Sequence, residues 1–511
     1  SQVNAPSARL PAVRVNKTGG TLTVTNSMYL NAGFIHTAGT IDWGTTTLSL
    51  IDNAQSVTAG TTIYNNVEFW CSACTMTVSG TMNVAGNLRL VTNTATGNII
   101  SGGGIALSGN LTNYSVAAGG VGYSGSTVIT FTGANNQTYA MSNTTNARVP
   151  NTVINKSGGT LTFSDHLFVA SGYTYSAGTV DWTTKGLYAY DATQTISPGA
   201  ITYPVGGIGC SSCTITVSGT WNIAGGFYMG NWSSSPGFST VNGGTINVGG
   251  DISNANSAAG GYGFGGTTDI VFNGSGNQAY TQSNATHARM PKVTINKPSG
   301  TLTFNNHLLT RSGFVYTAGT VSWGTSQLYV ADTGQTISPG SLVFGNVVFG
   351  ATGVTFTISG TMNISGNLYL QNWATVGGSS IVMNSGALEV AGNVDLSGSA
   401  AVTGGYLGTT VIRLVGSGAQ TISTTTATAP SFLTLEKTGS GTVTQTKNIL
   451  TGATRPITIS AGTWDMAGFN LTAGSGGLAA MTNNGVLRRG TSPSCGALSF
   501  STYTGTAAIC P

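Results

Sequence analysis

Hydrophobic and polar residues alternate in short runs along the whole chain. The first runs each begin directly after a glycine, and these glycines recur at intervals of 39 − 20 = 19, 60 − 39 = 21 and 80 − 60 = 20: Gly20, Gly39, Gly60 and Gly80. Alternation with a period of two predicts strands that are buried on one face, and glycine supplies the backbone angles that the turns between strands need. The pattern therefore predicts an all-β protein with a strand-containing segment about every 20 residues.

One stretch returns at long intervals and organises this pattern. Val15–Val24 reads VNKTGGTLTV, with close copies at Ile154–Phe163 and Ile295–Phe304 and a looser copy at Leu435–Thr444. The intervals between the lysines of these copies are 156 − 17 = 139, 297 − 156 = 141 and 437 − 297 = 140. We expect a strand, a tight turn and a second strand in each copy, with the turns defined by Lys17 and Gly20, Lys156 and Gly159, and Lys297 and Gly300.

Two architectures are compatible with such a spacing. One is an antiparallel meander in a sandwich or propeller, and the other is a solenoid with one coil per segment. Propeller blades of about 40–50 residues divide the superrepeat less well, and similar residues recur from segment to segment, as expected when like side chains stack between coils. We therefore predict a parallel β-helix (β-solenoid) with about 20 residues per coil, a 140-residue superrepeat and about seven coils in each superrepeat.

Each superrepeat contains a diverged duplication. A Gln-containing strand, a four-residue turn and a Gly-Thr strand occur twice. The second turn carries a residue pair that changes between repeats: Cys71 and Cys74, then Cys210 and Cys213, then Gly350 and Gly353. Because glycines can replace the cysteines, this pattern indicates a structural role for the cysteine pairs.

The repeats divide the chain into segments. Residues 1–10 form an N-terminal extension that is a candidate for contact between subunits, and solenoid units occupy 11–149, 150–290 and 291–429. A partial fourth unit covers 430–484, and residues 485–511 depart from the repeat. We interpret this last segment as a cap closed by a disulfide, because repeat arrays need capped ends.

Composition narrows the range of functions. Charged residues make up 6% of the 511 residues, against about 25% in ordinary soluble domains. The net charge of +4 is spread thinly, without the basic cluster of a nucleic-acid binder. No apolar run reaches the roughly 18 residues of a membrane helix. We expect a secreted chain without a membrane span, whose signal peptide has already been removed.

The six cysteines are expected to form three local disulfides. Residues i and i+3 of a β-turn lie within about 7 Å, which suits the Cα separation of a disulfide. This pairs Cys71 with Cys74 and Cys210 with Cys213, while Cys495 and Cys510 close the cap. A redox motif favours a helix N-terminus and a zinc site needs converging pairs, so both fit less well. Local disulfides indicate an oxidising compartment.

Candidate catalytic residues are sparse among the 13 carboxylates. Asp42 and Asp181 are equivalent, but the third repeat has Ser322 at this position, which favours a surface or ladder role. No cluster of acids with nearby basic residues indicates a polysaccharide-degrading enzyme. We expect no catalytic, cofactor-binding or metal-binding residue.

Histidines and aromatic residues also recur. His166 and His307 occupy equivalent positions, and His36 is replaced by tyrosine in the later repeats, so we interpret these histidines as turn or wall residues. The recurring Trp43, Trp182 and Trp323 predict aromatic ladders inside the solenoid. Exposed Tyr and Trp side chains that stack on sugars are the alternative.

The Gln-Thr-Ile, Asn-Lys-x-Gly-Gly-Thr-Leu-Thr and Ser-Gly-Thr patterns of residues 9–485 resemble the repeats of secreted bacterial surface proteins. These are proteins of the parallel β-helix type, such as haemagglutinin-like adhesins and autotransporter passengers. The resemblance is one of repeat style, and it carries over no catalytic residue. It implies a location outside the cell or at its surface and a structural or adhesive role.

We therefore expect a non-enzymatic structural subunit of an extracellular filament, sheath or surface layer. Exposed strand edges at solenoid ends template pairing with another chain, and head-to-tail contacts generate filaments. The expected junction involves Ser1, Gln2, Val3, Arg9, Arg488 and Arg489. The alternatives are a monomeric adhesin or glycan-binding rod, with glycans or the cell envelope as partners, and, less favoured, a polysaccharide-degrading β-helix enzyme.

Overall fold

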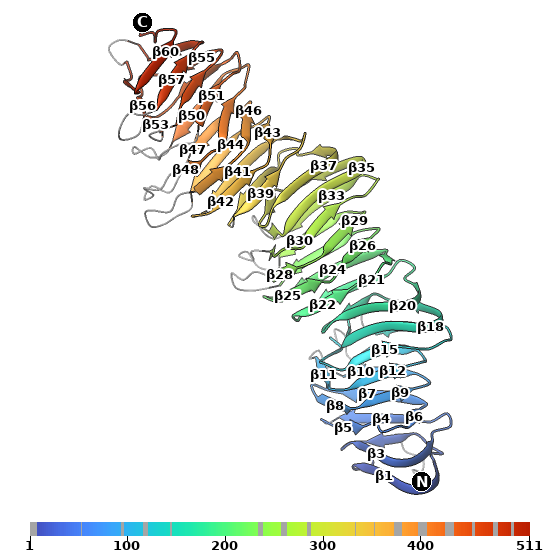
Figure 1. Cartoon of the computed structure of the whole chain (residues 1–511). Coiled ribbons are helices and arrows are strands. Elements are labelled where there is room, and N and C mark those ends of the chain that lie inside the picture. The colour runs from blue at the N-terminus through green and yellow to red at the C-terminus, as the bar shows by residue number, and fades with distance from the viewer. Residues whose placement is uncertain are drawn as a thin grey trace. The chain divides into compact units, whose positions relative to one another are not determined.

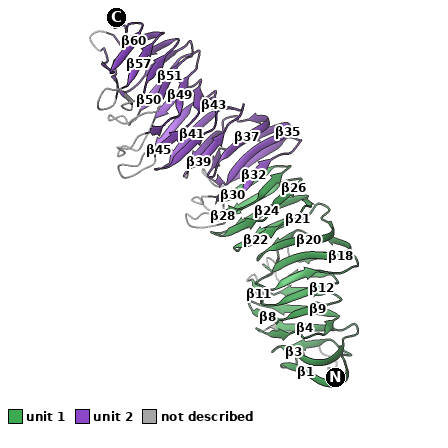
Figure 2. Cartoon of the chain, in the orientation of Figure 1, with its two compact units in different colours: residues 1–261 green, residues 262–511 purple. Residues whose placement is uncertain are grey.

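The computed structural model of the chain is an all-β, parallel β-solenoid, which confirms the predicted fold class (Figure 1). The structure describes residues 8–510 except 53, 94–96, 116–120, 144–145, 233–238, 257–262, 284–287, 333, 352, 373–380, 397–405, 425–433, 452–454, 474–478 and 492–494. No helix occurs among these residues. The chain forms two compact units, residues 1–261 and 262–511 (Figure 2).

A complete coil contains three strands. In the first unit, β8 (Thr75–Ser79), β9 (Thr81–Val84) and β10 (Leu88–Thr92) form one coil. They pair in parallel with β11 (Asn98–Ser101), β12 (Gly104–Leu107) and β13 (Leu111–Ser115) of the next coil. Because every strand pairs with its equivalent one coil later, like positions stack between coils.

The second unit has the same arrangement. The strands β45 (Ile381–Asn384), β46 (Ala387–Val390) and β47 (Val394–Leu396) form one coil. Their partners one coil later are β48 (Tyr406–Gly408), β49 (Val411–Leu414) and β50 (Gln420–Thr424). All of these pairs are parallel, as the predicted solenoid requires.

The coils are longer than predicted. One wall runs through β1 (Val13–Thr23), β3 (Phe34–Asp42), β5 (Ser56–Thr58), β8, β11 and β14 (Tyr123–Ser124), and then Gly122 pairs with Arg148. Paired positions along it differ by 34 − 13 = 21, 57 − 34 = 23, 77 − 56 = 21, 99 − 75 = 24, 123 − 98 = 25 and 148 − 122 = 26. These six steps cover one superrepeat, which therefore contains about six coils instead of seven.

The organising stretch forms one long, bulged strand rather than two strands and a tight turn. In the second repeat it is β18 (Asn151–Phe163), which pairs with β20 (Tyr173–Asp181) (Figure 1). Asn155 lies opposite Ala177 and Thr160 opposite Thr179, so four residues of β18 face the single Gly178. A Cβ atom at Gly178 would lie 2.7 Å from the Lys156 Cβ atom, so only glycine fits beneath the bulge.

The recurring tryptophans lie in the interior, which confirms the predicted aromatic ladders. Trp43, Trp182 and Trp323 are buried. The Trp182 ring stacks on Phe163 at a centroid distance of 3.8 Å and contacts Tyr203 at 5.1 Å. In the third repeat the Trp323 ring stacks on Phe304 in the same way, at a centroid distance of 4.4 Å. Burial of these rings explains why tryptophan repeats with the superrepeat period.

Candidate functional site

Two of the repeated lysines, Lys156 and Lys297, are buried donors to the preceding coil. The Lys156 side chain is 4% exposed. Its Nζ atom donates hydrogen bonds to the carbonyl oxygens of Gly133 (2.8 Å) and Asn135 (2.9 Å) and to Oε1 of Gln137 (2.7 Å). Three acceptors match the three N–H groups of an ammonium ion. Burial disfavours the charged form of the side chain and lowers the pKa of Lys156 below its ordinary value.

The third repeat contains the same cage. Lys297, which is 1% exposed, donates to the carbonyl oxygens of Gly274 (2.7 Å) and Gly276 (2.8 Å) and to Oε1 of Gln278 (2.8 Å). Its pKa is likewise lowered by burial. In the looser fourth copy Lys437 is also buried and donates to the carbonyl oxygen of Gly439.

The glutamine of the cage extends the network to a third coil. The Gln137 amide nitrogen donates to the carbonyl oxygens of Leu107 (3.0 Å) and Gly109 (2.6 Å). The sequence contains a signal for this link that the predictions above do not use. The interval from Gln to Lys is 156 − 137 = 19 in the second repeat and 297 − 278 = 19 in the third, which places the lysine one coil after the glutamine.

Lys17 differs from its later equivalents. It is half-exposed and lies in β1, the first strand of the described coils. The later cages are built from residues 19 to 23 positions before the lysine, and no described residue precedes Lys17 by that interval.

The cysteine pairs form the three predicted disulfides. Cys71–Cys74 and Cys210–Cys213 each have a Cα separation of 5.9 Å, and in Cys495–Cys510 it is 6.1 Å. The strand pairing corrects the assignment of the third repeat. Tyr190 pairs with Gly209 just as Ala331 pairs with Gly350, so the equivalents of Cys210 and Cys213 are Ala351 and Val354, one residue later than predicted.

The glutamines before the cysteine turns lack the lysine partner. The Gln194 amide donates to the carbonyl oxygens of Val169 and Tyr190. Its buried Oε1 has no hydrogen-bond partner among the described residues, and the same holds for Gln55. In the third repeat Thr310 supplies the missing donor to Gln335, at 3.0 Å.

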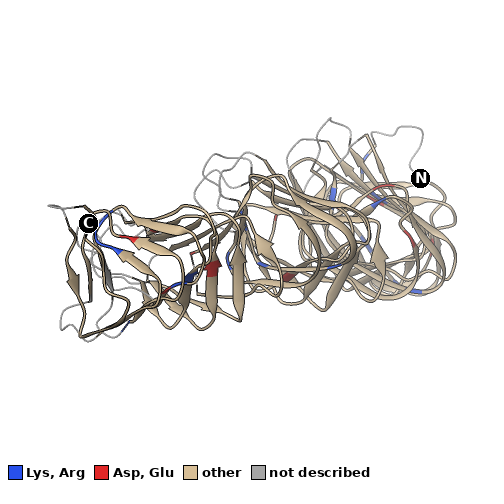
Figure 3. Ribbon diagram, turned by 90° about the horizontal axis from the view of Figure 1, so that it is seen from above, with Lys and Arg blue, Asp and Glu red and all other residues tan. Residues whose placement is uncertain are grey.

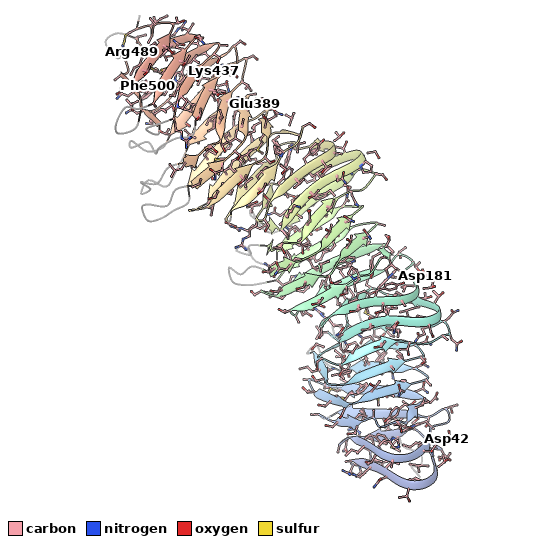
Figure 4. All side chains as sticks on the ribbon, in the orientation of Figure 1. Asp42, Asp181, Glu389, Lys437, Arg489 and Phe500 are labelled. Atoms are coloured by element: carbon pink, nitrogen blue, oxygen red, sulfur yellow. A yellow bond between two sulfur atoms is a disulfide. The ribbon has the colours of Figure 1, made fainter. Side chains whose placement is uncertain are left out.

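The repeated aspartates stabilise turns. Oδ1 of Asp42 accepts the backbone N–H of Gly44 (3.0 Å), and Oδ1 of Asp181 accepts that of Thr183 (2.8 Å). Figure 4 labels both residues, and the ribbon in Figure 3 marks the few charged residues along the described chain. These bonds agree with the interpretation of both residues as surface rather than catalytic groups.

The histidines also take the place of other side chains in bonds that recur between repeats. His166 Nδ1 accepts the backbone N–H of Gly186 (3.0 Å), and Ser27 Oγ accepts the equivalent N–H of Thr47 (3.2 Å). Burial is the main cause that lowers the pKa of His166, and Lys185 adds to it. His36 bonds to the carbonyl oxygen of Gly39, as the tyrosines that replace it do one and two repeats later.

An aromatic pocket lies on one wall of the second repeat. The wall consists of β17 (Arg148–Val149), β19 (Leu167–Val169), β21 (Gly186–Tyr190), β24 (Val205–Cys210) and β27 (Phe227–Asn231). The pocket measures about 590 Å³ and is lined by Asn146, Arg148, His166, Phe168, Tyr188, Tyr190, Tyr228 and Trp232. The sequence pattern does not reveal this group, because its members become neighbours only through the register of five strands.

An ion pair borders the aromatic pocket. Nε and Nη2 of Arg148 both donate to the Asp191 carboxylate. The guanidinium carbon also lies 5.7 Å from the centre of the Tyr190 ring. Arg289 and Asp332 form the equivalent pair in the third repeat, so this pair belongs to the shared framework.

The equivalent wall of the first repeat has a polar pocket of about 300 Å³. Its centre is Glu68, which accepts a hydrogen bond from Ser49 (3.0 Å) and pairs with Arg89 (2.7 Å). The Arg89 guanidinium lies 4.5 Å from the centre of the Tyr114 ring. The same framework therefore carries different side chains in different repeats.

The predicted junction residues are only partly described. Ser1, Gln2 and Val3 lie outside the described residues, and Arg9 is exposed beside Leu10, which pairs with Leu30. In the cap, Arg488 is exposed, whereas Arg489 Nε donates to the carbonyl oxygen of Gly496 (2.9 Å) (Figure 4).

The cap itself continues the solenoid. β60 (Thr502–Gly505) pairs with β57 (Ala480–Asn483), and β59 (Leu498–Ser499) pairs with β56 (Leu471–Ala473), all in parallel. β60 is exposed along its whole length. The last segment is thus a further coil closed by Cys495–Cys510.

No family model matches this chain, and neither a curated protein nor a solved structure matches it. The parallel β-solenoid fold is shown, and the resemblance to secreted bacterial surface proteins stays a prediction from repeat style. In the described ranges there is no helix suited to crossing a membrane. The same ranges contain no group of three or more His, Cys, Asp or Glu side chains that could hold a metal ion.

Proposed function

We propose that this protein is a non-enzymatic, extracellular structural subunit that assembles end to end through its strand edges. The observation that carries the proposal is the state of the first and last strands. Among the described residues, β1 pairs only with β3 and β60 pairs only with β57. Each leaves a row of backbone donors and acceptors that another strand edge can satisfy.

The rest of the molecule suits a structural role. The chain's recurring polar residues stabilise its own turns and coils: the lysines bond to carbonyl oxygens, the aspartates to backbone N–H groups and the cysteines to one another. Three disulfides favour an oxidising location. The aspartates and histidines that recur are already engaged in turns, which supports a protein without catalytic activity.

Electron microscopy of the purified full chain tests the proposal. A lysine on an edge strand opposes pairing with another edge, so the sharpest variant is Thr504→Lys in the exposed β60. The matched control is Thr336→Lys, on an exposed position of β39 (Gln335–Ser338), which pairs on both sides.

We expect regular filaments from the unmodified chain and from Thr336→Lys, and separate particles from Thr504→Lys. Deletion of residues 1–8 is also expected to prevent polymers, although the first seven of these residues lie outside the described part of the chain. Separate particles from the unmodified chain at every concentration would contradict end-to-end assembly. Filaments of normal length from Thr504→Lys would place the junction elsewhere.

A further inference from the structure

The aromatic pocket of the second repeat has a floor of glycine. Strand register places Arg148, Phe168, Tyr188, Gly207 and Tyr228 in one row across the wall. A neighbouring row contains Tyr190, Gly209 and Gly230. Tyrosine rings therefore stand beside bare backbone on both sides of Gly207.

The rings of Tyr188, Tyr190 and Trp232 pack directly against these glycines. A Cβ atom on Gly209 would come within 2.5 Å of the Trp232 ring and 2.6 Å of the Tyr190 ring. A Cβ atom on Gly207 would lie 2.7 Å from the Tyr188 ring. Side chains at these two positions would push the rings away from the wall, so the glycines allow the aromatic rings to lie close against the backbone.

The rings also contact one another. Phe168 stacks on Tyr188 at a centroid distance of 5.0 Å, and Tyr190 meets Trp232 edge to face at 4.8 Å. Tyr188, Tyr228 and Trp232 remain partly exposed. We call this open aromatic surface the aromatic platform; its rings are those of Phe168, Tyr188, Tyr190, Tyr228 and Trp232. The pocket over it measures about 590 Å³, which falls within the roughly 300–1,000 Å³ of small-molecule sites.

The polar groups at the rim carry little net charge. The Arg148 guanidinium is paired with the Asp191 carboxylate, and His166 accepts a backbone N–H at Nδ1, which leaves its other ring nitrogen as the donor of the neutral form. A cationic ligand would be repelled by Arg148, which lies beside the rings, and an anionic ligand would be repelled by Asp191. The chemistry of the pocket therefore favours a neutral ligand with one flat apolar face and hydrogen-bonding groups at its edge.

A hexopyranose has this form, because its ring presents a face of C–H groups and a rim of hydroxyls. We propose that the aromatic platform of the second repeat binds a neutral hexose unit within an oligosaccharide. The rings of Tyr188 and Trp232 cover the apolar face of the sugar, and Asn146, Arg148 and His166 receive or donate hydrogen bonds at its rim. This activity is separate from end-to-end assembly and does not depend on it.

The third repeat provides an internal control. Its corresponding row is Arg289, Leu309, Tyr329, Val348 and Tyr369. Tyr190 is replaced there by Ala331, and Val348 occupies the position of the glycine floor. The strand arrangement of the second repeat is thus retained in the third, but its aromatic platform is not. A substitution in the third-repeat row, such as Tyr329→Ala, therefore removes an equivalent tyrosine without touching the proposed site.

The experiment measures binding of the full chain by isothermal titration with cellohexaose, laminarihexaose and mannohexaose as neutral probes. Oligogalacturonate serves as the anionic probe and tetramethylammonium chloride as the cationic one. The variants are Tyr188→Ala, Gly207→Val and the control Tyr329→Ala, each checked for an unchanged thermal transition. Gly207→Val introduces the residue of the third repeat and keeps every aromatic ring.

We expect at least one neutral probe to bind, with an affinity that falls about tenfold in Tyr188→Ala, as the loss of one aromatic contact implies. Gly207→Val should weaken binding at least as much, and Tyr329→Ala should leave it unchanged. Absence of binding to all three neutral probes would overturn the proposal. So would binding only to oligogalacturonate or tetramethylammonium, or an equal loss of affinity in Tyr329→Ala.

Discussion

The lysine bulge and the cysteine turn of the second superrepeat occupy equivalent places in duplicated modules but are held in different ways. At the lysine bulge, the Lys156 ammonium group donates hydrogen bonds to Gln137 and to two carbonyl oxygens of the preceding coil. At the cysteine turn, the Cys210–Cys213 disulfide closes the turn on itself, and Gln194 Oε1 has no partner among the described residues. The lysine side chain therefore connects coils, whereas the disulfide links two residues of one turn.

The largest effect is expected from removing a caged lysine. Lys297→Met removes the charged donor from the carbonyl oxygens of Gly274 and Gly276 and leaves Oε1 of Gln278 with only the Gly274 N–H, so we expect the local unfolding free energy to fall by about 3–5 kcal/mol. Hydrogen exchange of the amides in β33 (Gln278–Ser283) and β35 (Lys292–Phe304) measures this change.

Lys17→Met is the matched control for this substitution. Lys17 is half-exposed and has no such cage among the described residues, so its replacement should change stability by less than about 0.5 kcal/mol. Equal losses in the two variants would show that the cage contributes little and that the apolar part of the lysine side chain alone stabilises the bulge.

The two classes of glutamine should also differ. Gln278→Leu removes an acceptor from a buried ammonium group and should cost about 2–3 kcal/mol. Gln194→Leu removes an oxygen that lacks a donor, along with two bonds from its amide, and should cost about 1 kcal/mol. Hydrogen exchange in the strands around each residue tests the difference, and an equal cost at both sites would refute it.

A smaller effect is expected at the cysteine turn. Cys210→Ala with Cys213→Val introduces the pair found in the third repeat. The four-residue loop closed by this disulfide yields about 2 kcal/mol in the chain-entropy model, which sets the upper limit of the loss. Thermal unfolding with and without reductant measures it, and a reductant effect that persists in the double variant would have to come from another disulfide.

The smallest predicted effect concerns pH. Burial lowers the pKa of His166 below its ordinary value of 6.5, so the folded state binds fewer protons than the unfolded state in this range. The stabilising contribution of neutral His166 is complete above pH 6.5 and is lost as the pH falls through the lower, folded-state pKa. His166→Ser, which supplies the acceptor of the first repeat, should remove this dependence from thermal unfolding curves. An unchanged pH profile in that variant would assign the titration to another group.

Much of the fold follows from the sequence because stacking enforces repetition. The spacing of Lys17, Lys156 and Lys297 predicted the superrepeat, the recurring tryptophans predicted an aromatic interior, and the Cys-x-x-Cys pairs predicted disulfides. The predicted number of coils in each superrepeat, about seven, was wrong. Some coils are longer than 20 residues, so fewer coils fit into the same superrepeat length. Leu111 and its partner Tyr139 one coil later, for example, differ by 139 − 111 = 28 in position.

The candidate sites were harder to predict. The lysine cage depends on groups 19 to 23 positions away that are mostly backbone carbonyls, which leave no mark on the sequence. The aromatic platform depends on Gly207 and Gly209, whose role appears only when neighbouring strands place rings above them. Sequence periodicity identifies what all repeats share, whereas both features depend on contacts between coils.

The direction of the cage bonds also sets an order in which the solenoid can be built. Gln137 bonds to residues 28 and 30 positions before it, and Lys156 bonds to residues 19 to 23 positions before it. At this cage the later coil therefore completes the one that precedes it, using acceptors that the earlier coil already supplies. A chain that folds from its N-terminus onward can form this cage as soon as Lys156 is available, without waiting for the residues that follow.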